Sequence, residues 1–172
     1  GGIFNSGTLT VSNSNISANS VYNRGSSNYG GDGGGIFNLG ILTISNSAIS
    51  GNSANLFGAS ARGAGGGIYN RGTVSVANST ISGNSATSGA GIFNFIRFSG
   101  DTGILTVSNS TLSGNTASGN ATTNGGGILN ASGGSLTVSN STISNNSATN
   151  GGGILNGSGG SLTVSNSTIS NN

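Results

Sequence analysis

Residues 135–144 read SLTVSNSTIS, and residues 161–170 repeat the same letters. Four earlier blocks follow the same pattern: TLTVSNSNIS at 8–17, ILTISNSAIS at 41–50, TVSVANSTIS at 73–82 and ILTVSNSTLS at 104–113. The blocks recur about every 30 residues, and a period of this length is typical of stacked repeat architectures. The block therefore predicts a solenoid in which each copy belongs to one coil.

Apolar residues alternate with Ser and Thr inside each block, which is the period of a β-strand with one buried face. Before each block stands a Gly-Ile element, followed by an aromatic residue or Leu and then by Asn. We assign two aliphatic columns to the interior, together with the Val11 and Ile16 positions of each repeat. The two columns are Ile3, Ile36, Ile68, Ile92, Ile128 and Ile154, and Leu9, Leu42, Val74, Leu105, Leu136 and Leu162.

Gly, Ser, Asn and Thr supply about two thirds of the 172 residues, a composition that without a period would indicate a flexible linker. The repeats argue against a linker, and the lack of an apolar stripe at helical spacing argues against helices. A single repeat cannot cover its own apolar face, so neighbouring repeats must stack. We expect an all-β fold: one parallel β-solenoid over residues 1–172, with about six coils of three short strands each.

Asparagine stands at the centre of every block. We expect these residues to point inward at corners of the coil and to pair along the axis as an Asn ladder. They are Asn13, Asn46, Asn78, Asn109, Asn140 and Asn166. Asn19 and its equivalents, such as Asn52, are assigned to a ladder in the same way. Asn78 and Asn140 begin Asn-Ser-Thr sequences, but inward residues are not accessible, so we expect no glycan on them.

Charged side chains make up only 3% of the chain, and there is no His or Cys. Zinc, haem and iron–sulfur sites need His or Cys, so no metal or cofactor is expected. Asp32 and Asp101 are the only carboxylate side chains and lie in different insertions, whereas glycosidases need a facing pair; we therefore do not expect an enzyme. The scattered arginines argue against nucleic-acid binding, and no apolar run is long enough for membrane insertion.

Two short elements of each repeat resemble a known family. GGGIYN at 65–70 and ISGNSA at 81–86 are similar to the GGA(I/L/V) and FxxN repeats of chlamydial polymorphic outer membrane proteins, and to related β-helix repeats of bacterial surface proteins. The resemblance covers the whole chain in six copies. It implies a right-handed parallel β-helix in a secreted bacterial protein at the cell surface, with a role in adhesion or surface structure.

Two sets of columns are expected to face outward. One follows the buried Ile of each repeat and forms a possible contact stripe: Phe4, Phe37, Tyr69, Phe93, Leu129 and Leu155. Such a stripe either is covered by loops or is a surface for another molecule. The other set pairs the Thr10 and Ser12 positions of each repeat into hydroxyl columns. These columns resemble an ice-binding face, and they are also what a solvated sheet of β-formers needs.

Insertions at residues 20–33, 53–64 and 94–103 interrupt the repeats and hold most of the charges and the unrepeated aromatic residues. In solenoids such insertions form loops that often carry binding. The candidates for binding are Tyr22, Arg24, Tyr29, Arg97 and Asp101. An alternative is that the charges only fix the loops, with Arg97 pairing with Asp101 and Arg24 pairing with Asp32.

The pattern favours an extracellular structural protein, a rod whose copies stack head to tail into a surface fibre or filament. We expect stacking because the chain begins and ends at repeat boundaries without a recognisable polar cap. The chain is then expected to be either a filament subunit or part of a longer chain. The partner would then be the protein itself. The alternative is an adhesin that binds polysaccharide or a host surface through its inserted loops.

Overall fold

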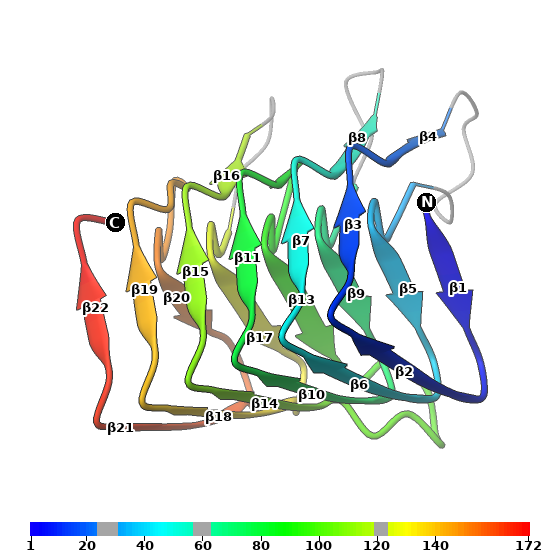
Figure 1. The fold of residues 1–172 in the computed structure, drawn as a ribbon. Helices are drawn as coiled ribbons and strands as arrows, with labels where there is room; N and C mark the ends of the chain where they lie inside the picture. Colours follow the sequence, from blue (N-terminus) through cyan, green and yellow to red (C-terminus); the bar gives the residue numbers. More distant parts are fainter. Residues whose placement is uncertain (24–30, 57–62, 119–123) are drawn as a thin grey trace.

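The chain forms a rod of stacked β-coils. The computed structural model describes residues 1–23, 31–56, 63–118 and 124–172. Within these ranges every regular element is a β-strand, and the strands stack in parallel along the rod (Figure 1). The two termini lie at opposite ends of the rod. The predicted all-β parallel β-solenoid is thereby confirmed.

Three sheets of six strands each form three sides of the rod. Sheet A contains β1 (Ile3–Asn5), β5 (Ile36–Asn38), β9 (Ile68–Asn70), β13 (Ile92–Phe95), β17 (Ile128–Ala131) and β20 (Ile154–Asn156). Sheet B contains β2 (Thr8–Ser12), β6 (Ile41–Ser45), β10 (Thr73–Ala77), β14 (Ile104–Ser108), β18 (Ser135–Ser139) and β21 (Ser161–Ser165). Sheet C contains β3 (Asn15–Ser17), β7 (Ala48–Ser50), β11 (Thr80–Ser82), β15 (Thr111–Ser113), β19 (Thr142–Ser144) and β22 (Thr168–Ser170).

A fourth side was not predicted. Sheet D contains β4 (Ser20–Asn23), β8 (Ser53–Leu56), β12 (Ser85–Ala86) and β16 (Thr116–Ala117). In the described residues, four coils therefore have all four strands, whereas the expectation was six coils of three strands. Sheet D has a separate small core built around Ala54, Ala86 and Ala117. The two-residue strands β12 and β16 are too short for an alternating pattern, and β4 and β8 lie in the segments 20–33 and 53–64 that the sequence marks as insertions.

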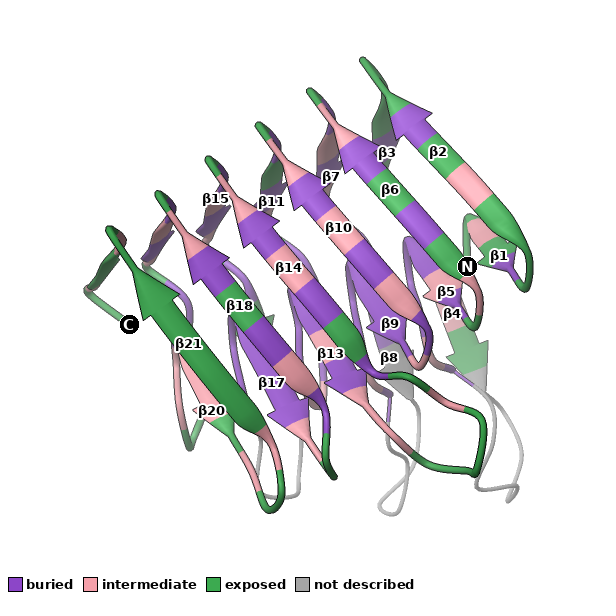
Figure 2. Cartoon of the chain, turned by 90° about the horizontal axis from the view of Figure 1, so that it is seen from below, coloured by how far each residue is buried: buried purple, intermediate pink, exposed green. Residues whose placement is uncertain are grey.

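Equivalent residues of successive coils lie side by side. In sheet B, Leu136 pairs with Leu105 on one side and with Leu162 on the other. The inward side chains of sheets A, B and C form one aliphatic core, which removes apolar surface from water along the whole rod. Figure 2 shows this buried stripe on sheet B and its loss at the terminal strand β21. The two assigned columns are buried at Ile36, Ile68, Ile92, Ile128, Leu42, Val74, Leu105 and Leu136, and partly buried at Ile3, Leu9 and Ile154.

The prediction of an inward Asn ladder at Asn13, Asn46, Asn78, Asn109, Asn140 and Asn166 is wrong. All six residues are exposed, at the turn between sheets B and C. Their φ angles lie between 48° and 50°, in the left-handed region that Asn tolerates better than most residues. Turn geometry therefore explains why Asn recurs at this position, whereas the amide ladders of the interior use other asparagines.

Candidate interaction surfaces

Two columns of Asn run through the interior of the rod. The first amide ladder lies where sheet A ends: Asn5, Asn38, Asn70, Asn94, Asn130 and Asn156. The second amide ladder follows sheet C: Asn19, Asn52, Asn84, Asn115, Asn146 and Asn172. The second was predicted from Asn19 and Asn52. The first was missed, although Asn follows the Ile-aromatic pair in every repeat and this recurrence could have indicated it.

Each ladder has a direction. The Nδ2 atom of Asn38 donates a hydrogen bond to Oδ1 of Asn70 at 2.8 Å, one coil further along the chain. In the second ladder, both Nδ2 and the backbone N–H of Asn84 donate to Oδ1 of Asn115, at 2.9 and 3.0 Å. Every ladder bond runs from a coil to the coil that follows it. Among the described residues no buried side-chain polar atom lacks a partner, which is a requirement for polar groups in an apolar interior.

The ladders end differently at the two edges of the rod. Among the described residues, at the C-terminal edge, Nδ2 of Asn156 donates only to the carbonyl of Gly160 at 2.9 Å, and Nδ2 of Asn172 only to the carbonyl of Ile143 at 3.0 Å. At the N-terminal edge and within the described part of the chain, Oδ1 of Asn5 accepts only the N–H of Gly7, and Oδ1 of Asn19 accepts no hydrogen bond. We call these the donor edge and the acceptor edge.

Aliphatic side chains are exposed on the donor edge. Leu162 is 38% exposed, Val164 41% and Ile169 48%. Their equivalents one coil earlier are at most 1% exposed, so the exposure comes only from the lack of a following coil. The edges of β20, β21 and β22 also carry backbone groups that pair with a neighbouring strand in the inner coils of the rod. Such an edge is a template for another strand.

The predicted contact stripe is a stack of rings over the first four coils. Ring centroids lie 5.5 Å apart for Phe4 and Phe37, 4.6 Å for Phe37 and Tyr69, and 5.4 Å for Tyr69 and Phe93. Phe95 packs against both Tyr69 and Phe93. Tyr69 is only 3% exposed, whereas Phe4 is 67% exposed. The stripe is thus covered at its middle and open at the acceptor edge.

The stripe continues into the last two coils as aliphatic residues, with Leu129 buried and Leu155 half-buried. The first alternative, a covered column, is therefore confirmed only at the centre of the stripe, and a surface for another molecule stays a prediction for its exposed end. Its centre is an internal contact of the rod, and its first ring remains available to another molecule.

The insertion at 94–103 is fixed by an ion pair that the sequence did not suggest. Asp101 binds Arg71, from the preceding coil, with two hydrogen bonds of 2.8 and 2.9 Å, and it accepts the backbone N–H groups of Arg97 and Phe98. Burial favours a raised pKa for Asp101, but these hydrogen bonds outweigh it and lower the pKa to about 2. The expected side-chain pair of Arg97 with Asp101 is replaced by this contact. Arg71 lies 4.7 Å from the ring centre of Phe98.

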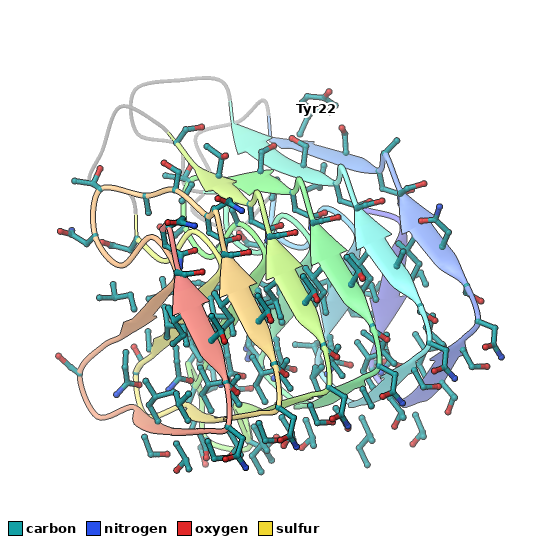
Figure 3. The ribbon with its side chains drawn as sticks, turned by 60° about the vertical axis from the view of Figure 1, so that its left-hand side comes forward. Tyr22 is labelled. Carbon is teal, nitrogen blue, oxygen red and sulfur yellow. The ribbon has the colours of Figure 1, made fainter. Side chains whose placement is uncertain are left out.

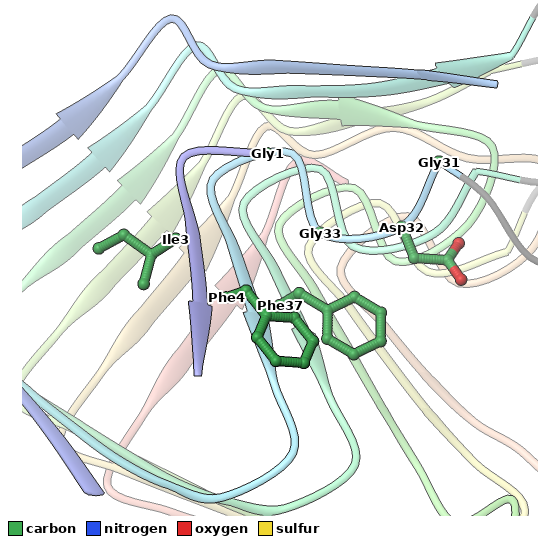
Figure 4. Close-up of a pocket in the computed structure, with 7 residues that line it drawn as sticks. All are labelled: Gly1, Ile3, Phe4, Gly31, Asp32, Gly33 and Phe37. Carbon is green, nitrogen blue, oxygen red and sulfur yellow. The ribbon is translucent and has the colours of Figure 1, made fainter. Parts of the chain in front are cut away.

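A pocket of about 240 Å³ lies beside the open end of the stripe (Figure 4). Phe4, Phe37 and Asp32 line it, together with backbone of nearby glycines. Burial raises the pKa of Asp32 to about 6, although the N–H of Ala64 donates to its carboxylate at 3.0 Å and the charge of Arg97 opposes the shift. Burial also raises the pKa of Tyr69, with the charge of Asp32 as the next contribution.

The described loop candidates for binding, Tyr22, Arg97 and Asp101, do not converge on one site. Tyr22 is 60% exposed on β4 of sheet D (Figure 3). Arg97 and Asp101 lie in the connection from sheet A to sheet B, at the opposite side of the rod in Figure 1. Arg24 and Tyr29 lie outside the described residues, and so does the expected pair of Arg24 with Asp32.

The Thr and Ser columns lie on the outer face of sheet B. Thr106 pairs with Ser75 and Thr137 in register, and the Ser12 column runs parallel to it. A third outward column contains Ile41 and Ile104, which are 53% and 42% exposed. These aliphatic residues lie beside the Thr column, so the outer face of sheet B is not covered by hydroxyl groups alone.

No protein-family model matches the chain, and no curated protein or solved structure matches it significantly. Within the described residues, no helix has the length and apolar character needed to cross a membrane.

Proposed function

We propose that the chain is a structural, non-enzymatic protein of the bacterial cell surface: a β-solenoid rod whose edges join coils of the same kind. In a sample of residues 1–172, the joining coil is that of a second copy, stacked head to tail into a filament. The observation that carries this proposal is the complementarity of the donor edge and the acceptor edge. The extracellular location and the right-handed coil rest on the resemblance to bacterial surface β-helix repeats.

A second copy continues the columns of sheets A, B and C. Stacking one strand spacing away, about 4.8 Å, places Ile154 against Ile3 and Leu162 against Leu9. It also places Val164 over Val11 and Ile169 over Ile16, so that the exposed aliphatic side chains of the donor edge become core. Burial of apolar surface of this kind stabilises association by about 25 cal/mol per Å² before the costs of association are subtracted.

The amide ladders favour one polarity of stacking. In a head-to-tail joint, Nδ2 of Asn156 donates to Oδ1 of Asn5, and Nδ2 of Asn172 donates to Oδ1 of Asn19. A head-to-head joint would bring acceptor oxygens against acceptor oxygens and leave buried polar groups unpaired, at about 1–3 kcal/mol for each group. Heterologous contacts of the head-to-tail kind do not close on themselves and therefore produce filaments.

A charged residue on the donor edge tests the proposal. Val164→Lys places an ammonium group at the joint, where burial without a partner is costly, while position 164 is exposed in the single rod. Thr137→Lys is the matched control, because Thr137 is exposed on the side of the rod. Sedimentation velocity should show concentration-dependent assembly of the parent and of Thr137→Lys, and a monomer for Val164→Lys. Equal assembly of all three proteins would refute the edge as the joint.

A further inference from the structure

Four of the exposed corner asparagines begin the same tripeptide. Asn78, Asn109, Asn140 and Asn166 are each followed by Ser and then Thr. Asn-X-Ser/Thr is the acceptor sequence for N-linked glycosylation when the asparagine is at the surface of a secreted protein. The four residues occupy equivalent places in successive coils, so they form one column along the edge between sheets B and C.

The corner asparagines are held by their backbone conformation and not by hydrogen bonds of their side-chain amides. The left-handed φ explains why Asn stands there, but the four side-chain amides have no partner among the described residues. The following Ser is used by the fold: Oγ of Ser79, for example, donates to the carbonyl of Ala77 at 2.7 Å. The Thr after it is exposed or half-buried, as at Thr80 and Thr111, so neither the Asn nor the Thr of the acceptor tripeptide is buried.

We propose that Asn78, Asn109, Asn140 and Asn166 are acceptors of N-linked sugars. In this transfer, Nδ2 forms a bond to C1 of a sugar, the bond from C1 to a diphosphate leaving group breaks, and one amide proton passes to a base of the transferase. The donor is a sugar activated by a nucleoside or lipid diphosphate. The proposal rests on the proposed surface location, because that location gives a reason for the modification.

Glycans on this edge have a physical purpose. The chain carries 3% charged residues, so little charge keeps rods from associating side by side. Sugars attached to the corner add a bulky hydrated layer to the side of the rod. The joints proposed above involve the axial edges of the coils instead, and the aromatic stripe lies on sheet A.

The chain provides an internal control. Asn130 begins the tripeptide Asn-Ala-Ser, but it is fully buried, and its Nδ2 donates to Oδ1 of Asn156 at 2.8 Å. Asn130 therefore has the acceptor sequence, but its burial should prevent modification. Exposed tripeptides outside the repeated corner begin at Asn15, Asn145 and Asn156, and Asn120 lies outside the described residues.

The test uses the folded chain, UDP-glucose and a soluble N-glucosyltransferase chosen because it modifies two synthetic peptides, residues 128–134 and residues 138–144. Site occupancy is mapped by peptide mass spectrometry. We expect a hexose on the four corner asparagines of the folded chain and none on Asn130. Thr111→Val should abolish modification of Asn109 alone, and Thr111→Ser should restore it.

Two results would overturn the proposal. One is an unmodified corner in the folded chain although the peptide 138–144 is modified. The other is modification of Asn130 as readily as Asn140, since the sites would then follow the sequence and not the surface. The non-assembling variant Val164→Lys should be modified like the parent, so failure of the acceptor sites and failure of filament formation are separate outcomes.

Discussion

Asn78 and Asn84 belong to the same coil and differ completely in their surroundings. Asn78 is exposed in a left-handed turn, whereas Asn84 is 1% exposed and sits in the second amide ladder. Oδ1 of Asn84 accepts the backbone N–H and Nδ2 of Asn52, and its own Nδ2 donates to the carbonyl of Ile49 and to Asn115. Asn thus serves two roles: it adopts the left-handed backbone conformation of a turn at position 78, and it forms hydrogen bonds with buried polar groups at position 84.

Removal of a ladder amide should be costly. Asn84→Ala leaves the buried partners on both neighbouring coils unpaired, and we expect the free energy of unfolding to fall by roughly 3–5 kcal/mol. Asn78→Gly is the control, since Gly adopts a positive φ without strain, and its effect should stay below about 1 kcal/mol. Urea unfolding followed by circular dichroism measures both changes. Equal effects would mean that the ladder hydrogen bonds do not stabilise the fold.

The two carboxylates predict an unusual dependence of stability on pH. The pKa of Asp32 is raised by burial to about 6, so its protonated form stabilises the fold below its ordinary value of 3.8, and this contribution is lost as pH rises through 6. The pKa of Asp101 is lowered to about 2, so its contribution is present above 3.8 and is lost as pH falls through 2. Since the chain has no Glu or His, thermal stability should be greatest near pH 4.

Single substitutions separate the two effects. Asp32→Asn should remove the decline in melting temperature between pH 4 and pH 6, and Asp101→Asn should remove the rise between pH 2 and pH 4. The charge of Arg97 opposes the shift of Asp32, and the raised pKa of Tyr69 keeps that neighbouring phenol protonated over this range. A decline between pH 4 and pH 6 that survives in Asp32→Asn would contradict the assignment.

At the scale of the elements, one strand spacing between coils leaves no room for side chains at certain corners. A Cβ atom on Gly67 would lie 2.6 Å from the carbonyl oxygen of Gly91 in the next coil, which is fixed backbone. A Cβ on Gly7 would meet nothing within 4 Å. The glycine before the sheet A strand is therefore a packing requirement of the stacked coils at Gly35, Gly67, Gly91 and Gly127.

Gly67→Ala should consequently destabilise the rod by about 3 kcal/mol, the upper part of the range for overpacking a filled interior. Gly7→Ala should leave the unfolding midpoint nearly unchanged. Thermal unfolding of the two variants under the same conditions measures the difference. If Gly67→Ala were as stable as Gly7→Ala, the coils would not be as closely spaced as described.

The sequence predicts those elements that leave a pattern in consecutive residues. The alternation of apolar residues with Ser and Thr around Leu136 identifies sheet B and its buried face, because successive side chains of a strand point to opposite faces. The corner Asn78 was misassigned, since a repeated Asn fits both an internal ladder and a left-handed turn. The Arg71–Asp101 pair and the strands of sheet D depend on neighbours one coil away, and no short-range pattern encodes them.

The whole rod is a polar object with two complementary edges. In the proposed filament, copies join donor edge to acceptor edge without a break in the sheets. Cryo-electron microscopy of assembled residues 1–172 would show such a joint. We predict an unbranched filament in which β20 of one copy lies one strand spacing, about 4.8 Å, from β1 of the next, with all copies pointing the same way. Isolated rods at high concentration, or rods joined with alternating direction, would contradict it.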